Sequence, residues 1–210
     1  MFDTGAQGKP EMNVYDFDET IFHPDSSFSF FCFCARHNTL AVSKCIPSAV
    51  VQFFRYLIHG KSDARQLKEA LFSFLNRIDN VEYYVQRFWE VHAGQIAPWY
   101  LAQKKPDDLI ISASPDFLLR PIVQELGVNL IATRMNPYTG KITGKNCHDH
   151  EKARRLLELY PNAIVDEFYS DSRCDDPLAE LAAKAYLVRG NERIPWPDRN
   201  KDHLVPGINN

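Results

Sequence analysis

A pair of carboxylates near the start of the chain, Asp16 and Asp18, directly follows the β-type run 13–15. Two acids separated by one residue point the same way if the backbone stays extended, and the hydroxyl of Thr20 can fix the turn that follows. Such a pair can hold one hard cation. Mg²⁺ often takes only one or two carboxylates besides substrate phosphate, so the site then needs one supplementary acid.

The supplementary acid is available in the segment 170–177, which reads SDSRCDDP. Asp171 and Asp175 come after a strand predicted over 163–168, so they should emerge at the same sheet edge as Asp16. Acids inside that strand are weaker candidates because they do not lie past its end. Two strand ends are therefore expected to face one cleft.

Two further segments can bind an anion. The strand predicted over 109–111 ends in Ser112 and Ala113, and the helix predicted over 115–126 has N-terminal amides that suit a phosphate oxygen. Lys152, near the start of another predicted helix, can offset the charge on a phosphoryl group and on the carboxylates beside it. Together these residues suit the binding of a phosphorylated ligand.

These residues must be positioned by an α/β scaffold. Helical periodicity fills the region from about residue 25 to residue 94, whereas strands and helices alternate after Trp99. We therefore expect a Rossmann-like core with a parallel sheet and an inserted α-helical cap. The expected division is 12–21 and 97–190 for the core, 22–96 for the cap, 1–11 for a loose leader and 191–210 for a polar tail.

The periodicity and the turn residues predict individual elements along the chain. The predicted strands are 13–15, 109–111, 129–133, 163–168 and 185–188, with a hairpin over 138–144. The predicted helices are 28–37, 46–59, 64–75, 81–92, 115–126, 150–159 and 177–183.

Composition limits the function classes. With 45% hydrophobic and 24% charged residues, the chain has the profile of a packed protein. A net charge of −3 gives no general attraction to nucleic acid. The longest apolar stretches, 28–35 and 45–58, are too short or too interrupted to span a bilayer, so no stable membrane insertion is expected. Five cysteines without CxxC spacing, and no secretory signal, favour the cytoplasm.

Several residues have a structural interpretation beside a functional one. The run Cys147-His148-Asp149-His150 could suggest zinc, but adjacent residues cannot all reach one tetrahedral ion, so a turn before a helix is favoured. The many aromatic residues of helices 28–37 and 46–59 are expected to form the inside of the cap. If part of that apolar surface lines the substrate path, it favours a phosphorylated lipid or aromatic.

Four segments of the chain, DFDET, IISASP, HEKARRL and SDSRCDDP, occur in the order and approximate spacing of the four motifs of the haloacid dehalogenase (HAD) superfamily. The chain most resembles the phosphoserine-phosphatase-like branch, in which a helical cap is inserted just after the first motif. One departure is Ser170, where the fourth motif often has glycine. Because Asp176 follows Asp175, either residue could be the second acid of that motif.

The resemblance implies a role for each matched residue. Asp16 would be the nucleophile and a Mg²⁺ ligand, and Asp18 would be the acid/base and bind Mg²⁺ through its carbonyl. Asp171 would be the third ligand. Ser112, Ala113 and Lys152 would bind phosphate, Asp175 would support Lys152, and Thr20 would steady the first loop. Asp25 would either cap the first cap helix or contact a substrate amine.

The expected activity is Mg²⁺-dependent hydrolysis of a small phosphorylated metabolite through an aspartyl-phosphate. Three alternatives stay open. The same nucleophile could serve a phosphotransferase or mutase, the substrate could be a phospholipid head group, or the fold could bind a phosphorylated partner without turnover. The sequence does not identify the substrate or the oligomeric state.

Overall fold

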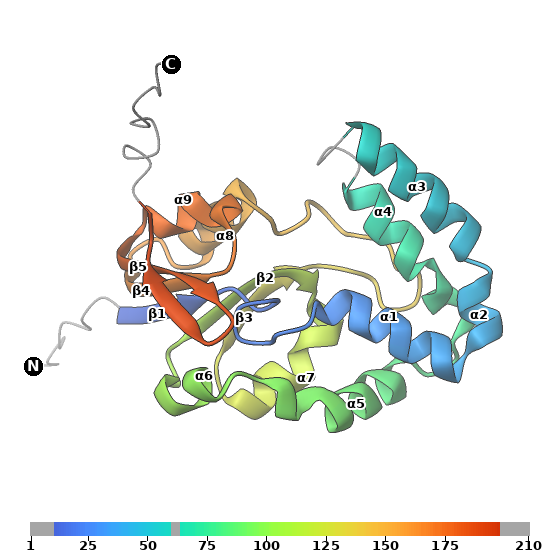
Figure 1. Cartoon of the computed structure of the whole chain (residues 1–210), viewed down its shortest axis with the longest axis horizontal. Helices are drawn as coiled ribbons and strands as arrows, with labels where there is room; N and C mark the ends of the chain where they lie inside the picture. The colour runs from blue at the N-terminus through green and yellow to red at the C-terminus, as the bar shows by residue number, and fades with distance from the viewer. Residues whose placement is uncertain (1–10, 60–63, 198–210) are drawn as a thin grey trace, which may run out of the picture.

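A computed structural model describes residues 11–59 and 64–197, so residues 1–10 of the predicted leader and most of the predicted tail lie outside this range, whereas Glu11 belongs to the first strand and not to the leader. Strands of the described part form one sheet in the order β3-β2-β1-β4-β5-β6 (Figure 1). The pairings from β3 to β5 are parallel, and β6 is antiparallel to β5. The strands are β1 (Glu11–Tyr15), β2 (Leu109–Pro115), β3 (Asn129–Thr133), β4 (Ile164–Ser170), β5 (Ala182–Arg189) and β6 (Glu192–Pro195). This mostly parallel sheet with helices around it confirms the predicted α/β class.

The central strand β1 is covered on both faces, as is typical of parallel strands. Neighbouring residues on the strand point to opposite sides: Val14 packs with Leu109 and Phe168, whereas Tyr15 packs with Ile110 in the larger core that reaches into the helical region. All of these side chains are fully buried. The strand end that carries Asp16 is therefore held rigidly.

The core helices connect the strands and cover the sheet. They are α6 (Pro98–Gln103), α7 (Asp116–Leu126), α8 (His150–Leu159), the 3-10 turn η4 (Arg173–Asp175) and α9 (Asp176–Ala179). Helix α7 ends at Gly127, whose positive φ of 70° lets its N–H bond to the carbonyls of Val123 and Gln124. This cap turns the chain back into β3.

The helices between β1 and β2 form the region predicted as the cap. They are α1 (Ser26–His37), α2 (Thr39–Ser43), α3 (Ile46–His59), α4 (Ala64–Leu71), η2 (Phe72–Arg77), α5 (Val81–His92) and η3 (Ala93–Gln95). Asp25 caps α1 by accepting from the backbone N–H of Phe28 at 2.7 Å, which is the capping alternative predicted for it. In Figure 1, α3 and α4 lie side by side at the end of the molecule away from β5 and β6.

The segment predicted as a hairpin over 138–144 forms a minimal one rather than two regular strands. An antiparallel bridge joins Met135 and Ile142, and the backbone N–H groups of Asn136 and Thr143 donate to the carbonyls of Lys141 and Arg134. Gly140, with a φ of 69°, lies directly against the backbone of Phe72, where a Cβ would not fit. The glycine therefore serves both the turn, where its N–H donates to the carbonyl of Asn136, and a close contact with Phe72 of the helical region.

The carboxyl-terminal elements also differ from the prediction. Helix α9 ends at Ala179 instead of continuing to residue 183, because β5 already begins at Ala182 to pair with β4. Glu192–Pro195 form the edge strand β6 where the sequence predicts a polar tail. Trp196 fixes this end of the chain, because its ring packs on Phe168, and such tertiary contacts are invisible to local propensity.

Candidate active site

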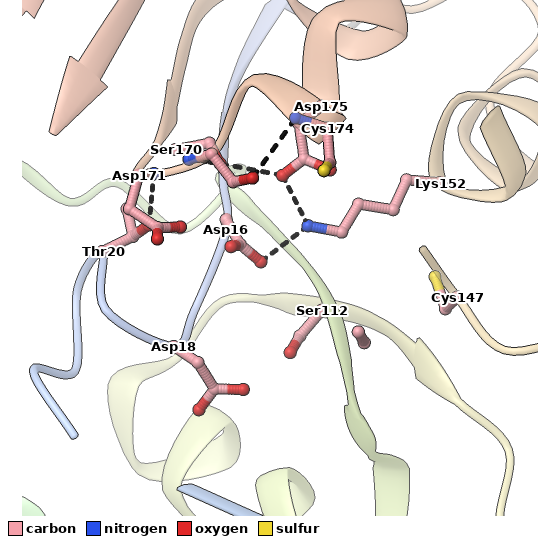
Figure 2. Close-up of polar contacts among 12 residues, drawn as sticks. Asp16, Asp18, Thr20, Ser112, Cys147, Lys152, Ser170, Asp171, Cys174 and Asp175 are labelled. Carbon is pink, nitrogen blue, oxygen red and sulfur yellow. Dashed lines mark hydrogen bonds and ion pairs between the residues drawn. The ribbon is translucent and has the colours of Figure 1, made fainter. Parts of the chain in front are cut away.

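The carboxyl ends of three neighbouring strands, β2, β1 and β4, bring the predicted site residues to one edge of the sheet (Figure 2). Asp16 directly follows β1, and its backbone N–H extends the ladder by donating to the carbonyl of Tyr169 at 2.8 Å. Ser112 is the middle residue of β2, directly after the apolar run 109–111, and Asp171 follows β4. This edge is where open α/β sheets place their ligands.

Lys152 is the charged centre of this edge. It comes from the first turn of α8, and its Nζ donates to Asp16 Oδ1 and to Asp175 Oδ2, each at 2.7 Å. Its side chain is only 3% exposed. Ser170 Oγ also donates to Asp175 Oδ2 at 2.8 Å. One buried ammonium group thus joins the ends of β1, β4 and α8.

Burial and charge act in opposite directions in this cluster. Burial acts to lower the pKa of Lys152, but the carboxylates of Asp16 and Asp175 outweigh it and raise that pKa, so the ammonium stays charged. Burial raises the pKa of Asp16, and the nearby Asp175 carboxylate adds to the effect while Lys152 opposes it. The site therefore has more negative than positive charge to accommodate.

The side chain of Asp18 does not join Lys152, although the extended-strand argument predicts that it should point the same way as Asp16. Glu19 has a φ of 56°, and the chain turns there. Asp18 Oδ1 accepts from the backbone N–H of Ser26 at 2.7 Å and Oδ2 from Ser114 Oγ at 2.5 Å. Figure 2 accordingly shows Asp18 apart from Asp16 and Lys152.

The environment of Asp18 suits a group that exchanges a proton. Burial raises its pKa to about 6, and the negative charge of Asp25 adds to this, while the hydrogen bonds from Ser114 and Ser26 oppose it. A carboxyl group with a pKa near neutrality can donate a proton in one step and accept one in the next. Ser26 and Ser114 also hold it in a fixed orientation, because each comes from the start of a helix or the end of a strand.

The first loop and the fourth segment are tied together by a buried hydroxyl. Thr20 Oγ1 accepts from the backbone N–H of Asp171 at 3.0 Å and lies 3.4 Å from Asp171 Oδ1. Burial raises the pKa of Asp171, partly opposed by Lys152. Thr20 thereby places the carboxylate of Asp171 next to the loop that carries Asp16.

The pairing of β2 is irregular towards its carboxyl end, where an anion could bind. The register with β3 shifts between Ser112 and Pro115, and such irregularities re-aim side chains next to active sites. Ser112 is completely buried, and its Oγ accepts from the backbone N–H of Ser114 at 3.0 Å. The carbonyl of Ala113 accepts from a lysine of the cap, Lys68, at 2.6 Å.

Lys68 is the residue that sequence reasoning missed. It lies on α4, and its Nζ reaches Ala113 O and, at 3.5 Å, Asn146 Oδ1. Burial lowers its pKa, and the negative charges of Asp18 and Asp25 oppose this effect. A single lysine on a short amphipathic helix carries no sequence signal that separates it from a solvated one.

Arg65, also on α4, anchors the cap to the core instead of facing the site. Its guanidinium donates to the carbonyl of Ile142 at 2.7 Å and to that of Gly144 at 2.9 Å. Glu69, one turn later, accepts from Arg65 and from the backbone N–H of Ile142 at 3.1 Å. Helix α4 is therefore fixed to the loop before α8, and this holds Lys68 over the site.

The sequence matches a family model described as haloacid dehalogenase-like hydrolase over residues 14–180. The chain belongs to the haloacid dehalogenase-like hydrolase family. This assignment agrees with the resemblance in the four motifs, which all lie within the matched residues.

Individual relatives of this HAD hydrolase share much of its length. Protein CicA of Caulobacter vibrioides is 27% identical over 213 residues, which cover 88% of this chain and 90% of that protein. A crystal structure of a protein of unknown function from Bordetella pertussis Tohama I superimposes with a TM-score of 0.69 at 22% identity, covering 85% of this chain and 90% of that one. A probable phosphoserine phosphatase from Vibrio cholerae has a TM-score of 0.58 at 15% identity, covering 84% of this chain and 55% of that one. These two structures show a common fold.

The residues that could hold Mg²⁺ in this HAD hydrolase are few but chemically suitable. In residues 11–59 and 64–197 no group of three or more His, Cys, Asp or Glu residues is placed to hold a metal ion. The predicted set has only two carboxylates, Asp16 and Asp171, with the backbone carbonyl of Asp18, so it would not form such a group. Burial raises the pKa of both carboxylates, because it destabilises their negative charge. A hard divalent cation held by these carboxylates would compensate that charge.

The zinc alternative at 147–150 is not supported. Cys147 is fully buried, and burial raises the pKa of its thiol to about 11. A zinc ligand must be a thiolate, which this environment disfavours. Asp149 caps α8 by accepting from the backbone N–H of His150 at 2.8 Å, so the segment is a turn before a helix.

The structure distinguishes the two adjacent acids of the fourth motif. Asp175 is buried against Lys152 and Ser170, whereas Asp176 Oδ1 accepts from Trp196 Nε1 at 2.9 Å and lies 3.6 Å from Arg173 Nε. Asp175 therefore contacts the charged centre of the edge, and Asp176 holds the carboxyl-terminal segment that follows β6.

We expect Asp175→Asn to lower kcat about 10- to 100-fold, because residues that orient a charged group of the site typically have effects of this size. Asp176→Asn should leave kcat within a factor of a few and lower the free energy of unfolding by about 1 kcal/mol through the weakened bond to Trp196. Phosphate release and urea denaturation of the two variants measure both effects. Equal losses of activity in the two variants would contradict this assignment.

Proposed function

We propose that this HAD hydrolase is a Mg²⁺-dependent phosphomonoester hydrolase in which Asp16 attacks phosphorus. The observation that carries the proposal is the buried Lys152 ammonium, 2.7 Å from both Asp16 and Asp175, at the edge where Ser112 and Asp171 also lie. A carboxylate is a weak nucleophile toward an anionic phosphate, and a fixed positive charge reduces the repulsion between them.

In the first step the carboxylate of Asp16 forms a bond to phosphorus while the bond between phosphorus and the leaving oxygen breaks. Asp18 donates its proton to that oxygen, and the orientation of its carboxyl group by Ser26 and Ser114 supports this role. The product alcohol then leaves. The enzyme retains the phosphoryl group as an aspartyl-phosphate on Asp16.

In the second step Asp18, now a carboxylate, takes a proton from water, and the water oxygen attacks phosphorus. The bond between phosphorus and Asp16 breaks, which regenerates the free carboxylate and releases inorganic phosphate. Asp18 thus serves as acid and then as base. Its pKa, raised to about 6 by burial, supports both roles near neutral pH.

The phosphoryl oxygens need partners throughout both steps. We assign Lys152, Ser112 and the backbone of Ala113 to them, because they come from the ends of α8 and β2 that surround Asp16. When bound by Asp16, Asp171 and the carbonyl of Asp18, Mg²⁺ would supply positive charge against the phosphoryl oxygens. Asp175 keeps Lys152 in position, and Thr20 keeps Asp171 in position.

The proposed substrate is a small phosphorylated metabolite that fits beneath the cap, where Lys68 reaches the backbone of Ala113. The cap would exclude bulk water from the phosphorylated enzyme. All five cysteines are free thiols, which fits the cytoplasm expected from the sequence. In residues 11–59 and 64–197, no helix combines the length and apolar character needed to cross a membrane.

A phosphate-release screen tests the proposed function. The purified chain is incubated with amino-acid, sugar, nucleotide and lipid phosphomonoesters, each with Mg²⁺ and with EDTA. We expect at least one substrate to release phosphate only with Mg²⁺, and addition of excess Mg²⁺ should restore the activity lost in EDTA. Equal rates in EDTA and Mg²⁺ would contradict the role of the metal. Release only when an acceptor alcohol is present would favour a phosphotransferase.

A further inference from the structure

Helix α3 exposes an unusually large apolar surface. Seven large hydrophobic side chains of this helix are between 46% and 76% exposed, and they are Ile46, Val50, Val51, Phe53, Phe54, Leu57 and Ile58. In a surface helix of a globular protein the apolar stripe normally faces the core. Here the side that packs on the rest of the cap includes Ala49, which is buried, and Gln52 and Tyr56, which are half-buried.

Helical geometry places these seven side chains on one continuous face. At 100° per residue, they occupy an arc of about 160° around the helix axis, and Arg55 lies at the border of that arc. Contiguous exposed apolar surfaces of this kind mark interaction sites, whereas scattered single residues do not. The helix has 14 residues, so it is about 21 Å long. It is too short to span a bilayer but long enough to lie in its surface.

The charge of the sequence segment that contains α3 favours one kind of partner. Residues 26–62 contain four basic residues and no Asp or Glu, in a chain whose net charge is −3. The basic residues of this acid-free segment are Arg36, Lys44, Arg55 and Lys61. Lys44, just before α3, and Arg55, on α3, are exposed, whereas Arg36 is exposed on α1 beside Tyr83 and Arg87 of α5. If a second copy of the chain bound here, the same basic segment would lie on both sides of the contact, and like charges would meet. An anionic lipid surface has the opposite charge to this segment.

The position of α3 links this face to the active site. Helix α3 lies beside α4 (Figure 1), and α4 carries Lys68, whose Nζ donates to the backbone of Ala113 in the site. Arg65 and Glu69 fix α4 to the core loop before α8. A surface that contacts α3 would therefore be one helix away from the phosphate-binding edge.

We propose that the exposed face of α3 docks this protein on the surface of an anionic phospholipid bilayer. The apolar side chains enter the boundary between head groups and acyl chains, and the exposed basic residues Lys44 and Arg55 contact the lipid phosphates. If the proposed phosphatase function holds, on which this consequence rests, docking brings the site to phosphomonoesters carried by lipids.

Co-sedimentation of the full chain with vesicles tests the proposal. The vesicles are phosphatidylcholine alone, or phosphatidylcholine mixed with phosphatidylglycerol. We expect at least about tenfold tighter binding to the mixed vesicles, and binding should weaken as salt is raised. The triple variant Phe54→Gln/Leu57→Gln/Ile58→Gln should lose at least about tenfold in affinity. Because these side chains are exposed, the variant should fold, which circular dichroism checks.

A matched control replaces three exposed leucines of the core, Leu101→Gln/Leu157→Gln/Leu159→Gln, and should bind vesicles like the wild type. Each of these proteins is also measured with Asp16→Asn added, so that binding is assessed without turnover. The binding test therefore stays valid even if the phosphatase proposal fails. No binding, or equal binding of the wild type and the α3 variant, overturns the proposal. A lipid-free dimer that the α3 variant dissociates would assign the face to a second copy and also overturn it.

Discussion

Asp16→Asn should lower kcat by at least about 10⁴-fold on any phosphomonoester that the protein hydrolyses, because loss of a nucleophile removes the covalent route altogether. The amide of asparagine has the same shape as the carboxylate but does not attack phosphorus. The fold should persist, because β1 and its buried neighbours are unchanged. Since burial raises the pKa of Asp16, replacing its charge should cost little stability. Steady-state phosphate release and thermal unfolding measure the two effects.

The matched control for this substitution is Asp107→Asn, which changes an exposed carboxylate in the loop before β2. It should leave kcat and the unfolding temperature close to those of the wild type. If Asp16→Asn kept activity within a factor of a few of the wild type, Asp16 would not be the nucleophile. The assignment of the other site residues to phosphate binding would then also lose its basis.

Lys152→Met has the second largest expected effect, and it acts on both activity and stability. We expect kcat to fall about 10²- to 10³-fold, because a buried charge that stabilises the attacked phosphoryl group is lost. The free energy of unfolding should fall by about 3–5 kcal/mol, because Asp16 and Asp175 are left as buried carboxylates without their common partner. Urea denaturation and phosphate release measure the two effects.

The pH dependence of this variant has a definite sign. Without the ammonium, the pKa of Asp16, which burial already raises, should rise further, and this carboxylate becomes neutral as the pH is lowered. The loss of stability relative to the wild type should therefore shrink at low pH and grow at high pH. Lys145→Met, which replaces an exposed lysine, is the control and should be neutral. A constant difference across pH would contradict the pairing of Lys152 with the two carboxylates.

The sequence was sufficient to predict the strand ends that organise the site. Asp16, Ser112 and Asp171 each follow or end an apolar run, and parallel strands bring such ends to the same edge. Lys152 could be assigned only through the resemblance of HEKARRL to the third HAD motif, because a single lysine near a helix start carries no signal of its own. The positions of Asp16, Ser112 and Asp171 depend on hydrophobic patterning and chain direction, both of which are encoded locally.

Other parts of the site depend on contacts between distant segments. The carboxylate of Asp18 is held by Ser114, 96 positions away, and this contact replaces the shared orientation that an extended strand would give. The choice between Asp175 and Asp176 follows from the position of Trp196, in a segment predicted as a tail. Lys68 enters the site because of the way α4 is anchored, which no local pattern encodes.

The exposed face of α3 is another feature that local sequence patterns do not predict. The sequence predicts a helix over 46–59, and the structure has α3 at Ile46–His59. Amphipathic periodicity, however, predicts that apolar residues face the core. Only the arrangement of the cap helices shows that much of this apolar surface is exposed.

The most direct test of the account is to trap the phosphorylated enzyme. The protein is mixed with the best substrate of the screen and Mg²⁺, quenched in acid, and reduced with borohydride, which converts an aspartyl-phosphate into homoserine. Peptide mapping by mass spectrometry then locates the changed residue, with unreacted protein as the control. We predict homoserine at position 16 and no change at Asp18 or Asp171. Phosphate release with an unchanged Asp16, or with the label on another residue, would contradict the central claim that Asp16 carries the phosphoryl group.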